Sequence, residues 1–81
     1  MFVVYVLRSK LNGILYVGQT GNFLRRMIEH ETGLARFTRG RGPWELIYKE
    51  LYNLRAEAIS REKFLKSGKG REWLKNLFEL I

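Results

Sequence analysis

Residues 2–18, FVVYVLRSKLNGILYVG, decide the fold because they contain two strands and the turn between them. The run at 2–8 is apolar and rich in β-branched and aromatic residues, which predicts a strand covered on both faces. Asn12-Gly13 is a hairpin turn signal, and residues 14–18 form the returning strand. The chain therefore begins with a β-hairpin.

The turn sets which side chains of the hairpin share a face. If Asn12-Gly13 forms a two-residue turn, Leu11 faces Ile14. Odd positions of the first strand then share a face with even positions of the second. Tyr5 and Tyr16 are expected on the same side of the sheet.

The rest of the chain alternates helical and strand patterns, with glycines at the breaks. The expected elements are a helix from Gly21-Asn22 to about Thr32 that stops at Gly33, a flexible loop over 33–43, a strand over Trp44–Tyr52, a helix over about Arg55–Lys66 and, after the SGKG break, a helix over Arg71–Leu80. This order, β-β-α-β-α-α, predicts an α+β fold with a small three-stranded, mostly antiparallel sheet flanked by three helices.

Composition limits the chemistry available. The 81 residues suffice for one core, so we expect a single domain over residues 1–81. The absence of cysteine excludes thiolate nucleophiles and cysteine zinc sites, and His30 as the single histidine excludes multi-histidine metal sites. All eight acidic residues are glutamates, which argues against two-metal nucleases and phosphotransferases, because these generally need several clustered carboxylates, often aspartates. Without a long apolar run or a signal-like start, we expect a soluble, cytoplasmic protein.

The net charge of +7 favours polyanionic partners, nucleic acid before an acidic membrane surface. One alternative is charge that only aids solubility, as in a protein-interaction adaptor. Another is membrane-surface binding by the apolar stripe of the last helix, which we expect instead to be needed for the core. That stripe comprises Trp73, Leu74, Leu77, Phe78 and Ile81.

Helical geometry separates two adjacent arginines of the first helix. Its apolar stripe is formed by Phe23, Leu24, Met27 and Ile28. Arg26 and His30 lie one turn apart at the edge of this stripe, whereas Arg25 points to water. Arg26 can therefore reach over the sheet. The alternative is that Arg26 only covers the core and His30 only caps the helix C-terminus.

Glu62 conflicts with its position in the second expected helix. It lies on the inward stripe, at i+4 from Ala58 and i−3 from Leu65. A carboxylate there is costly unless a cation, a metal ion or hydrogen bonds compensate. Glu62 is thus either a site residue or the partner of Arg26 in a buried structural ion pair.

At this point the motifs resemble a known family. VVYVL at 3–7, YVG at 16–18, NFLRRMIEH and REKFL occur in the order seen in the GIY-YIG endonucleases, in particular the small single-domain members. The resemblance covers nearly the whole chain. The first motif reads Val-Val-Tyr, and Gln19 stands where some members have a lysine.

The resemblance implies roles for single residues. Tyr5 and Tyr16 are the two motif tyrosines, with Tyr5 taking a proton from water and Tyr16 orienting water or phosphate. Arg26 is the helix arginine that stabilises the transition state, and His30 assists proton transfer or contacts the backbone. Glu62 is the ligand of one Mg²⁺ or Mn²⁺ ion.

The implied function is a metal-dependent endonuclease that hydrolyses DNA with weak sequence specificity, in repair or recombination. A protein partner or self-association would supply targeting. The alternative is a non-catalytic nucleic-acid-binding module on the same scaffold. Basic side chains expected to contact the nucleic-acid backbone are Arg36, Arg39, Lys66 and Lys69. The SGKG segment lacks the first glycine and the trailing Ser/Thr of a Walker A motif, so nucleotide hydrolysis is not expected.

Overall fold

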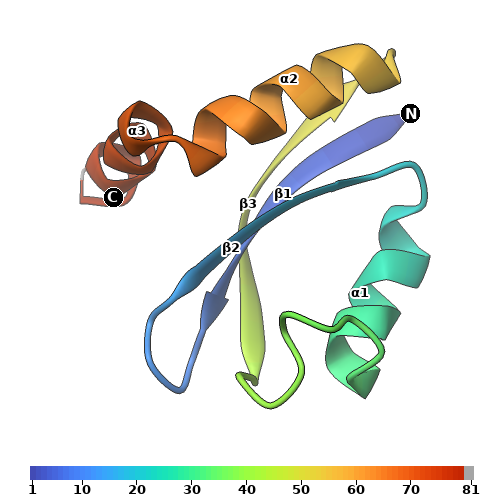
Figure 1. Cartoon of the computed structure of the whole chain (residues 1–81), viewed down its shortest axis with the longest axis vertical. Helices are drawn as coiled ribbons and strands as arrows, with labels where there is room; N and C mark the ends of the chain where they lie inside the picture. The colour runs from blue at the N-terminus through green and yellow to red at the C-terminus, as the bar shows by residue number, and fades with distance from the viewer. Residues whose placement is uncertain (80–81) are drawn as a thin grey trace.

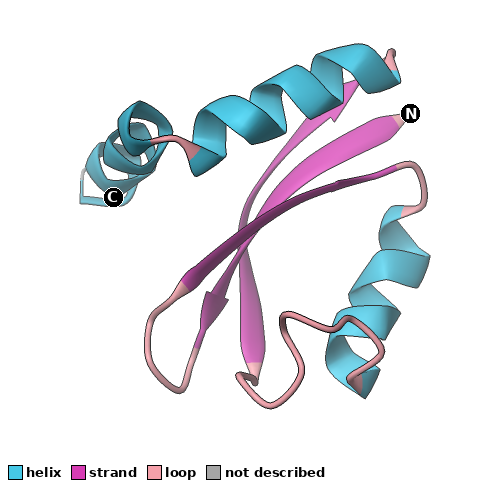
Figure 2. Ribbon diagram, in the orientation of Figure 1, coloured by secondary structure: helices cyan, strands magenta, loops and turns pink. Residues whose placement is uncertain are grey.

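A computed structural model describes residues 1–79 of the chain. A three-stranded antiparallel sheet carries helices on both faces, as the sequence predicts (Figure 2). The elements in chain order are β1 (Phe2–Ser9), β2 (Leu15–Thr20), α1 (Phe23–Thr32), β3 (Trp44–Tyr52), α2 (Arg55–Lys66) and α3 (Gly68–Glu79). In this part of the chain no helix is long and apolar enough to cross a bilayer. Leu80 and Ile81, which belong to the expected last helix and its stripe, lie outside the described residues.

The central strand β1 is the axis of the fold. The strand order is β2-β1-β3, so β1 is paired along both edges while β2 and β3 each leave one edge free. α1 covers one face of the sheet, and α2 and α3 lie on the other (Figure 1). The run Val3–Leu7 is buried throughout, which confirms the prediction of a strand covered on both faces.

The β-hairpin turn is longer than predicted. Ser9 N–H donates to the carbonyl of Ile14 at 2.9 Å, so residues 10–13 form the loop, and Leu11 does not face Ile14. A two-residue type I′ turn needs positive φ at both central residues, and here only Gly13, at φ 77°, has it. The Ser9 hydroxyl instead accepts from the backbone N–H groups of Leu11 and Asn12.

The register shift leaves the faces unchanged. Leu7 pairs with Tyr16 and Tyr5 with Gly18, a displacement of two residues from the expected register. Side chains alternate with a period of two, so a shift by two restores the same face. Tyr5 and Tyr16 therefore do share one face, the face under α1.

A bulge in β3 changes which positions of that strand point toward each face of the sheet. Its partner in β1 changes from Val6, opposite Tyr48, to Leu7, opposite Leu46, so one extra residue of β3 is inserted there. Before the bulge, Trp44 and Leu46 lie on the α1 side. After it, Tyr48 and the following even-numbered residues lie on the α2 side.

The inward face of α1 differs from the expected stripe. Phe23 and Met27 pack against β1 and His30 is buried, but Leu24 and Ile28 are 73% and 50% exposed. The helix is rotated so that Arg26 and His30 point inward, where Tyr5 and Tyr16 supply hydrogen-bond partners. Asn22 caps the helix N-terminus and Gly33 ends it with φ 80°, as predicted.

On the opposite face a half-buried carboxylate, that of Glu50, fixes α2 to β3. Glu50 accepts hydrogen bonds from Tyr48, from Tyr52 and, at 2.9 and 3.0 Å, from the guanidinium of Arg61 in α2. Burial opposes the charged form of Glu50, but these donors hold its pKa below the usual value. Trp73 of α3 stacks beside this network, against the Tyr48 ring and Arg61.

The third helix begins earlier than predicted, at Gly68 rather than Arg71. The Ser67 hydroxyl accepts from Gly70 N–H at 3.2 Å and so acts as the helix cap. Leu74 is fully buried and Phe78 packs on the same core, so this apolar stripe is used for packing.

Two glycines of α3 give a matched test of the α2–α3 junction. A Cβ on Gly70 would collide with the Phe64 carbonyl and lie 2.5 Å from Leu65 Cα, whereas one on Gly68 would meet no atom of residues 1–79 within 4 Å. Gly70→Ala should lower the free energy of unfolding by about 3 kcal/mol or more. Gly68→Ala should change it by less than about 1 kcal/mol. Urea unfolding measures both, and equal effects would contradict the described packing.

Candidate active site

Four of the predicted site residues meet on the α1 face of the sheet. Tyr5 comes from β1, Tyr16 from β2, and Arg26 and His30 from α1. Arg26 Nε donates to the Tyr5 hydroxyl at 3.3 Å, and its Nη2 donates to the Tyr16 hydroxyl at 3.4 Å. The structure therefore joins all four side chains in one cluster, since His30 Nε2 lies 2.8 Å from the Tyr5 hydroxyl.

The hydrogen bonds of this cluster have one consistent direction. Arg26 can only donate, so the Tyr5 oxygen accepts from it, and the His30 tautomer that also gives the Tyr5 proton an acceptor is the one with Nε2 unprotonated. His30 then carries its own proton on Nδ1 and donates to Thr38 Oγ1 at 2.7 Å. The Thr38 hydroxyl donates in turn to the Ala35 carbonyl at 3.3 Å. The side-chain polar atoms of Tyr5, His30 and Thr38 therefore all have hydrogen-bond partners.

Burial keeps the two inner members neutral at physiological pH. Tyr5 is fully buried, and burial raises its pKa well above the ordinary value, although the hydrogen bond from Arg26 acts in the opposite direction. His30 is 5% exposed. Its burial, together with the charge of Arg26, lowers its pKa to about 4. Tyr5 therefore keeps its proton, and His30 is an acceptor.

Arg26 and Tyr16 are the members open to solvent. The Arg26 side chain is 32% exposed, and Tyr16 is half-buried. Burial works against the charged form of Arg26, but its hydrogen bond with Glu29 at 3.0 Å raises the pKa again. Arg26 stays a cation that is held by Glu29, Tyr5 and Tyr16, whereas the side chain of Arg25 is 76% exposed.

The space around Gly18 explains why the YVG stretch ends in a glycine. This residue pairs directly with Tyr5 across the two strands and is buried. A Cβ at this position would lie 2.5 Å from the Tyr5 hydroxyl oxygen and 2.6 Å from the adjoining ring carbon. Only glycine leaves room for the Tyr5 phenol to lie across β2 and reach Arg26 and His30.

Glu62 lies outside this cluster. It is in α2, which packs on the opposite face of the sheet, and its side chain is 20% exposed. The ion pair with Arg26, offered above as the alternative, is not the observed one. Glu62 pairs with Lys66 at 3.6 Å, and Arg26 pairs with Glu29.

Two hollows at the β2 edge connect the two faces of the sheet. One, of about 840 Å³, is lined by Tyr16 on one side and by Lys66, the ion-pair partner of Glu62, on the other. The second, of about 530 Å³, is lined by Arg26 together with Gln19 and Arg55 at the start of α2. Because β2 is an edge strand, side chains from both faces border the same surface.

The remaining predicted residues are peripheral. Arg36, Arg39 and Lys69 are exposed, the first two on the loop after α1 and Lys69 in the first turn of α3. That loop is anchored by Thr38, which is 2% exposed and whose backbone carbonyl accepts a hydrogen bond from Trp44 Nε1 at 2.9 Å.

Three residues of the site were not predicted as site residues. Thr38 gave no periodic signal, and Trp44 was predicted only as the start of a strand, because the contact between these two residues depends on the path of the loop. Glu29 had a signal in its i+3 spacing from Arg26.

The sequence matches a known family of catalytic domains and is similar to several known proteins. Residues 1–76 match the family model of the GIY-YIG catalytic domain. A UPF0213 protein from Clostridium perfringens is 43% identical over 67 residues, which cover 82% of this chain and 71% of that protein. One from Staphylococcus saprophyticus is 32% identical over 77 residues, covering 94% and 93%. The solution NMR structure of a UPF0213 protein from Bacillus halodurans is 36% identical with a TM-score of 0.59, covering 95% of this chain and 85% of that chain.

The buried neutral His30 should make stability depend on pH. Its pKa falls from 6.5 to about 4 on folding, so below pH 6.5 the unfolded state binds a proton that the folded state does not. The free energy of unfolding should decrease by about 2 kcal/mol between pH 7 and pH 5, a range in which glutamates stay mostly ionised. Urea unfolding across this range measures the change. His30→Gln should remove this slope, and an unchanged slope would rule out His30 as its cause.

Proposed function

Because this chain belongs to the GIY-YIG catalytic domain family, a family of nuclease domains, we propose that residues 1–81 act as one endonuclease domain that hydrolyses phosphodiester bonds in DNA. The observation that carries the proposal is the joining of Tyr5, Tyr16, Arg26 and His30 in one hydrogen-bonded cluster beside an edge strand. The net charge of +7 suits a polyanionic substrate.

The members of the cluster divide into those that touch substrate and those that position them. Arg26 presents a planar guanidinium at a partly open position and would bind phosphate oxygens as negative charge grows on them. Tyr16, beside it, would orient the attacking water or the phosphate. Tyr5 and His30 are buried and hydrogen bonded to each other, so we assign them to positioning. This differs from the role that the resemblance implies for Tyr5, because its hydroxyl has no access to water.

The residues present fit a sparsely held divalent ion. Mg²⁺ typically takes one or two carboxylates and keeps several waters, so Glu62 can suffice as its protein ligand. Gln19 Oε1 is buried on the face that α2 covers and accepts no hydrogen bond from residues 1–79. This amide oxygen is therefore available as a metal ligand. No cluster of three acidic or histidine side chains exists in the same part of the chain. Bound Mg²⁺ or Mn²⁺ would neutralise phosphate charge and lower the pKa of a coordinated water.

The substrate would lie along the β2 edge, with Arg26 and Tyr16 on one side and Glu62 on the other. Lys66, Lys69, Arg36 and Arg39 would contact the backbone, which gives affinity without reading sequence. We therefore propose weak sequence specificity, with branched or damaged DNA of repair or recombination as the substrate class. A protein partner or a second copy would supply further targeting.

Arg26 and Arg25 form a matched pair for testing the cluster. Arg26→Ala should lower the cleavage rate of a labelled DNA in Mg²⁺ by about 100-fold or more, because the phosphate charge loses its donor. Arg25→Ala removes only an exposed contact to Glu29 at 3.6 Å and should cost less than about 5-fold. The assay compares flap, junction, duplex and single-stranded substrates. Equal losses in both variants would show that the cluster is not the active site.

Glu62 and Glu57, both in α2, form the second pair. Glu62→Gln should reduce Mg²⁺- or Mn²⁺-dependent cleavage by about 100-fold or more, because a neutral amide holds the ion poorly. It should leave DNA binding in EDTA unchanged. Glu57→Gln, at an exposed position, should behave like the parent. DNA binding without cleavage in the parent chain, unaffected by Glu62→Gln, would support the non-catalytic binding module instead.

A further inference from the structure

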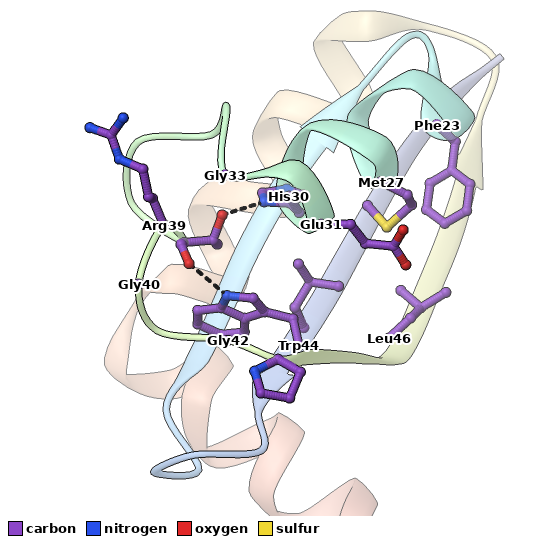
Figure 3. Close-up of a pocket in the computed structure, with 13 residues that line it drawn as sticks. Phe23, Met27, His30, Glu31, Gly33, Arg39, Gly40, Gly42, Trp44 and Leu46 are labelled. Atoms are coloured by element: carbon purple, nitrogen blue, oxygen red, sulfur yellow. Dashed lines mark hydrogen bonds between the residues drawn. The ribbon is translucent and has the colours of Figure 1, made fainter.

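A cavity of about 590 Å³ lies beside the cluster of Tyr5, Tyr16, Arg26 and His30, between α1 and the start of β3, and the loop over residues 33–43 closes one side of it (Figure 3). Its walls are mainly apolar and aromatic, with few charged side chains. The residues that shape it are Leu7, Phe23, Met27, His30, Trp44 and Leu46. Leu46 is 42% exposed, so the cavity opens to solvent.

The chemistry of the walls favours a flat aromatic ligand. Cavities of about 300–1,000 Å³ with apolar walls and a few polar groups are typical ligand sites. The indole N–H of Trp44 is already bonded to the Thr38 carbonyl, so Trp44 offers its ring rather than a donor. The two charged residues of the lining, Glu31 and Arg39, are both exposed. In Figure 3 the Arg39 guanidinium points away from the cavity, toward solvent, where an anionic backbone would pass.

We propose that this base cavity, defined by the six residues above, receives an unpaired nucleobase of the bound strand. The inference rests on the proposed function, since the strand is the one whose backbone is cut at the Arg26 cluster. Bases stack on aromatic side chains only when they leave the duplex, because paired bases are enclosed by their neighbours. The substrate class then narrows to nucleic acid with an unpaired base beside the scissile phosphate.

The base cavity and the cluster of Tyr5, Tyr16, Arg26 and His30 are joined by a continuous series of hydrogen bonds. Trp44 Nε1 donates to the Thr38 carbonyl at 2.9 Å, and the Thr38 hydroxyl lies 2.7 Å from His30 Nδ1. His30 then contacts Tyr5, which contacts Arg26. The Trp44 ring centroid also lies 6.4 Å from that of Tyr16. A base that packs on Trp44 and His30 therefore contacts the residues that position Arg26 and Tyr16.

The test measures base entry apart from cleavage. The full chain is mixed, in EDTA, with two DNA duplexes that differ only in one fluorescent 2-aminopurine, paired in the first and unpaired as a bulge in the second. We expect the bulged duplex to bind about 5- to 150-fold more tightly, the range for stacking one base on an aromatic side chain. Its emission should fall further on saturation as the base stacks in the cavity.

A matched pair of variants on β3 locates the base. Leu46→Trp reduces the room in the cavity and should abolish the preference for the bulge while leaving affinity for the paired duplex unchanged. Leu51→Trp, at a position 56% exposed on the same strand and outside the cavity lining, should keep the preference. Trp44→Phe, a smaller change that retains a ring, should weaken the preference without abolishing it. Thermal melting checks that each variant is folded.

The outcomes separate this inference from the proposed function. Binding and Mg²⁺-dependent cleavage of DNA with no preference for the unpaired base would overturn the base cavity and leave the nuclease assignment intact. Equal loss of the preference in Leu46→Trp and Leu51→Trp would place the base elsewhere and also overturn it. Absence of nucleic-acid binding altogether would reject both.

Discussion

Burial of β1 on both faces and pairing along both of its edges constrain everything else in the chain. Tyr5 is enclosed at the middle of β1 with no exposed surface, and a buried phenol requires hydrogen-bond partners. Arg26 and His30 supply them, at the cost of turning α1 so that Leu24 and Ile28 face water. The orientation of α1, the path of the following loop through Thr38 and the glycine at position 18 all follow from satisfying that one hydroxyl.

The two faces of the sheet contribute different properties to the proposed site. On the α1 face, the neutral side chains of Tyr5, His30 and Thr38 satisfy one another's hydrogen bonds. Beside them, hydrogen bonds to Tyr5 and Glu29 hold the cation of Arg26 in place. The α2 face holds an ion-paired carboxylate, Glu62, on a helix that the Glu50–Arg61 pair fixes to β3. Rigid support from two separate networks keeps both sides in place at the β2 edge. Such preorganisation is what charge stabilisation of a phosphate requires.

The sequence predicted the elements and the shared face of Tyr5 and Tyr16, because strand alternation survives a register shift of two residues. Arg26 was favoured over Arg25 by helical geometry alone, and the structure places Arg26 inward. The predicted inward face of α1 is wrong because hydrophobic periodicity contains no information on hydrogen-bond partners that other elements supply, here Tyr5 and Tyr16. Thr38 and Trp44 were missed for a related reason, since a loop without a period brings them together. Turn length was misjudged because only Gly13 adopts positive φ.

The single inserted residue near Ile47 separates β3 into two independently variable halves. Residues before it, Trp44 and Leu46, border the base cavity, and residues after it, such as Glu50, anchor α2. Relatives could therefore diversify the first half, and with it the ligand that the cavity admits, without disturbing the anchor. The bulge in this nine-residue edge strand would thus allow the proposed ligand preference and the attachment of α2 to evolve separately.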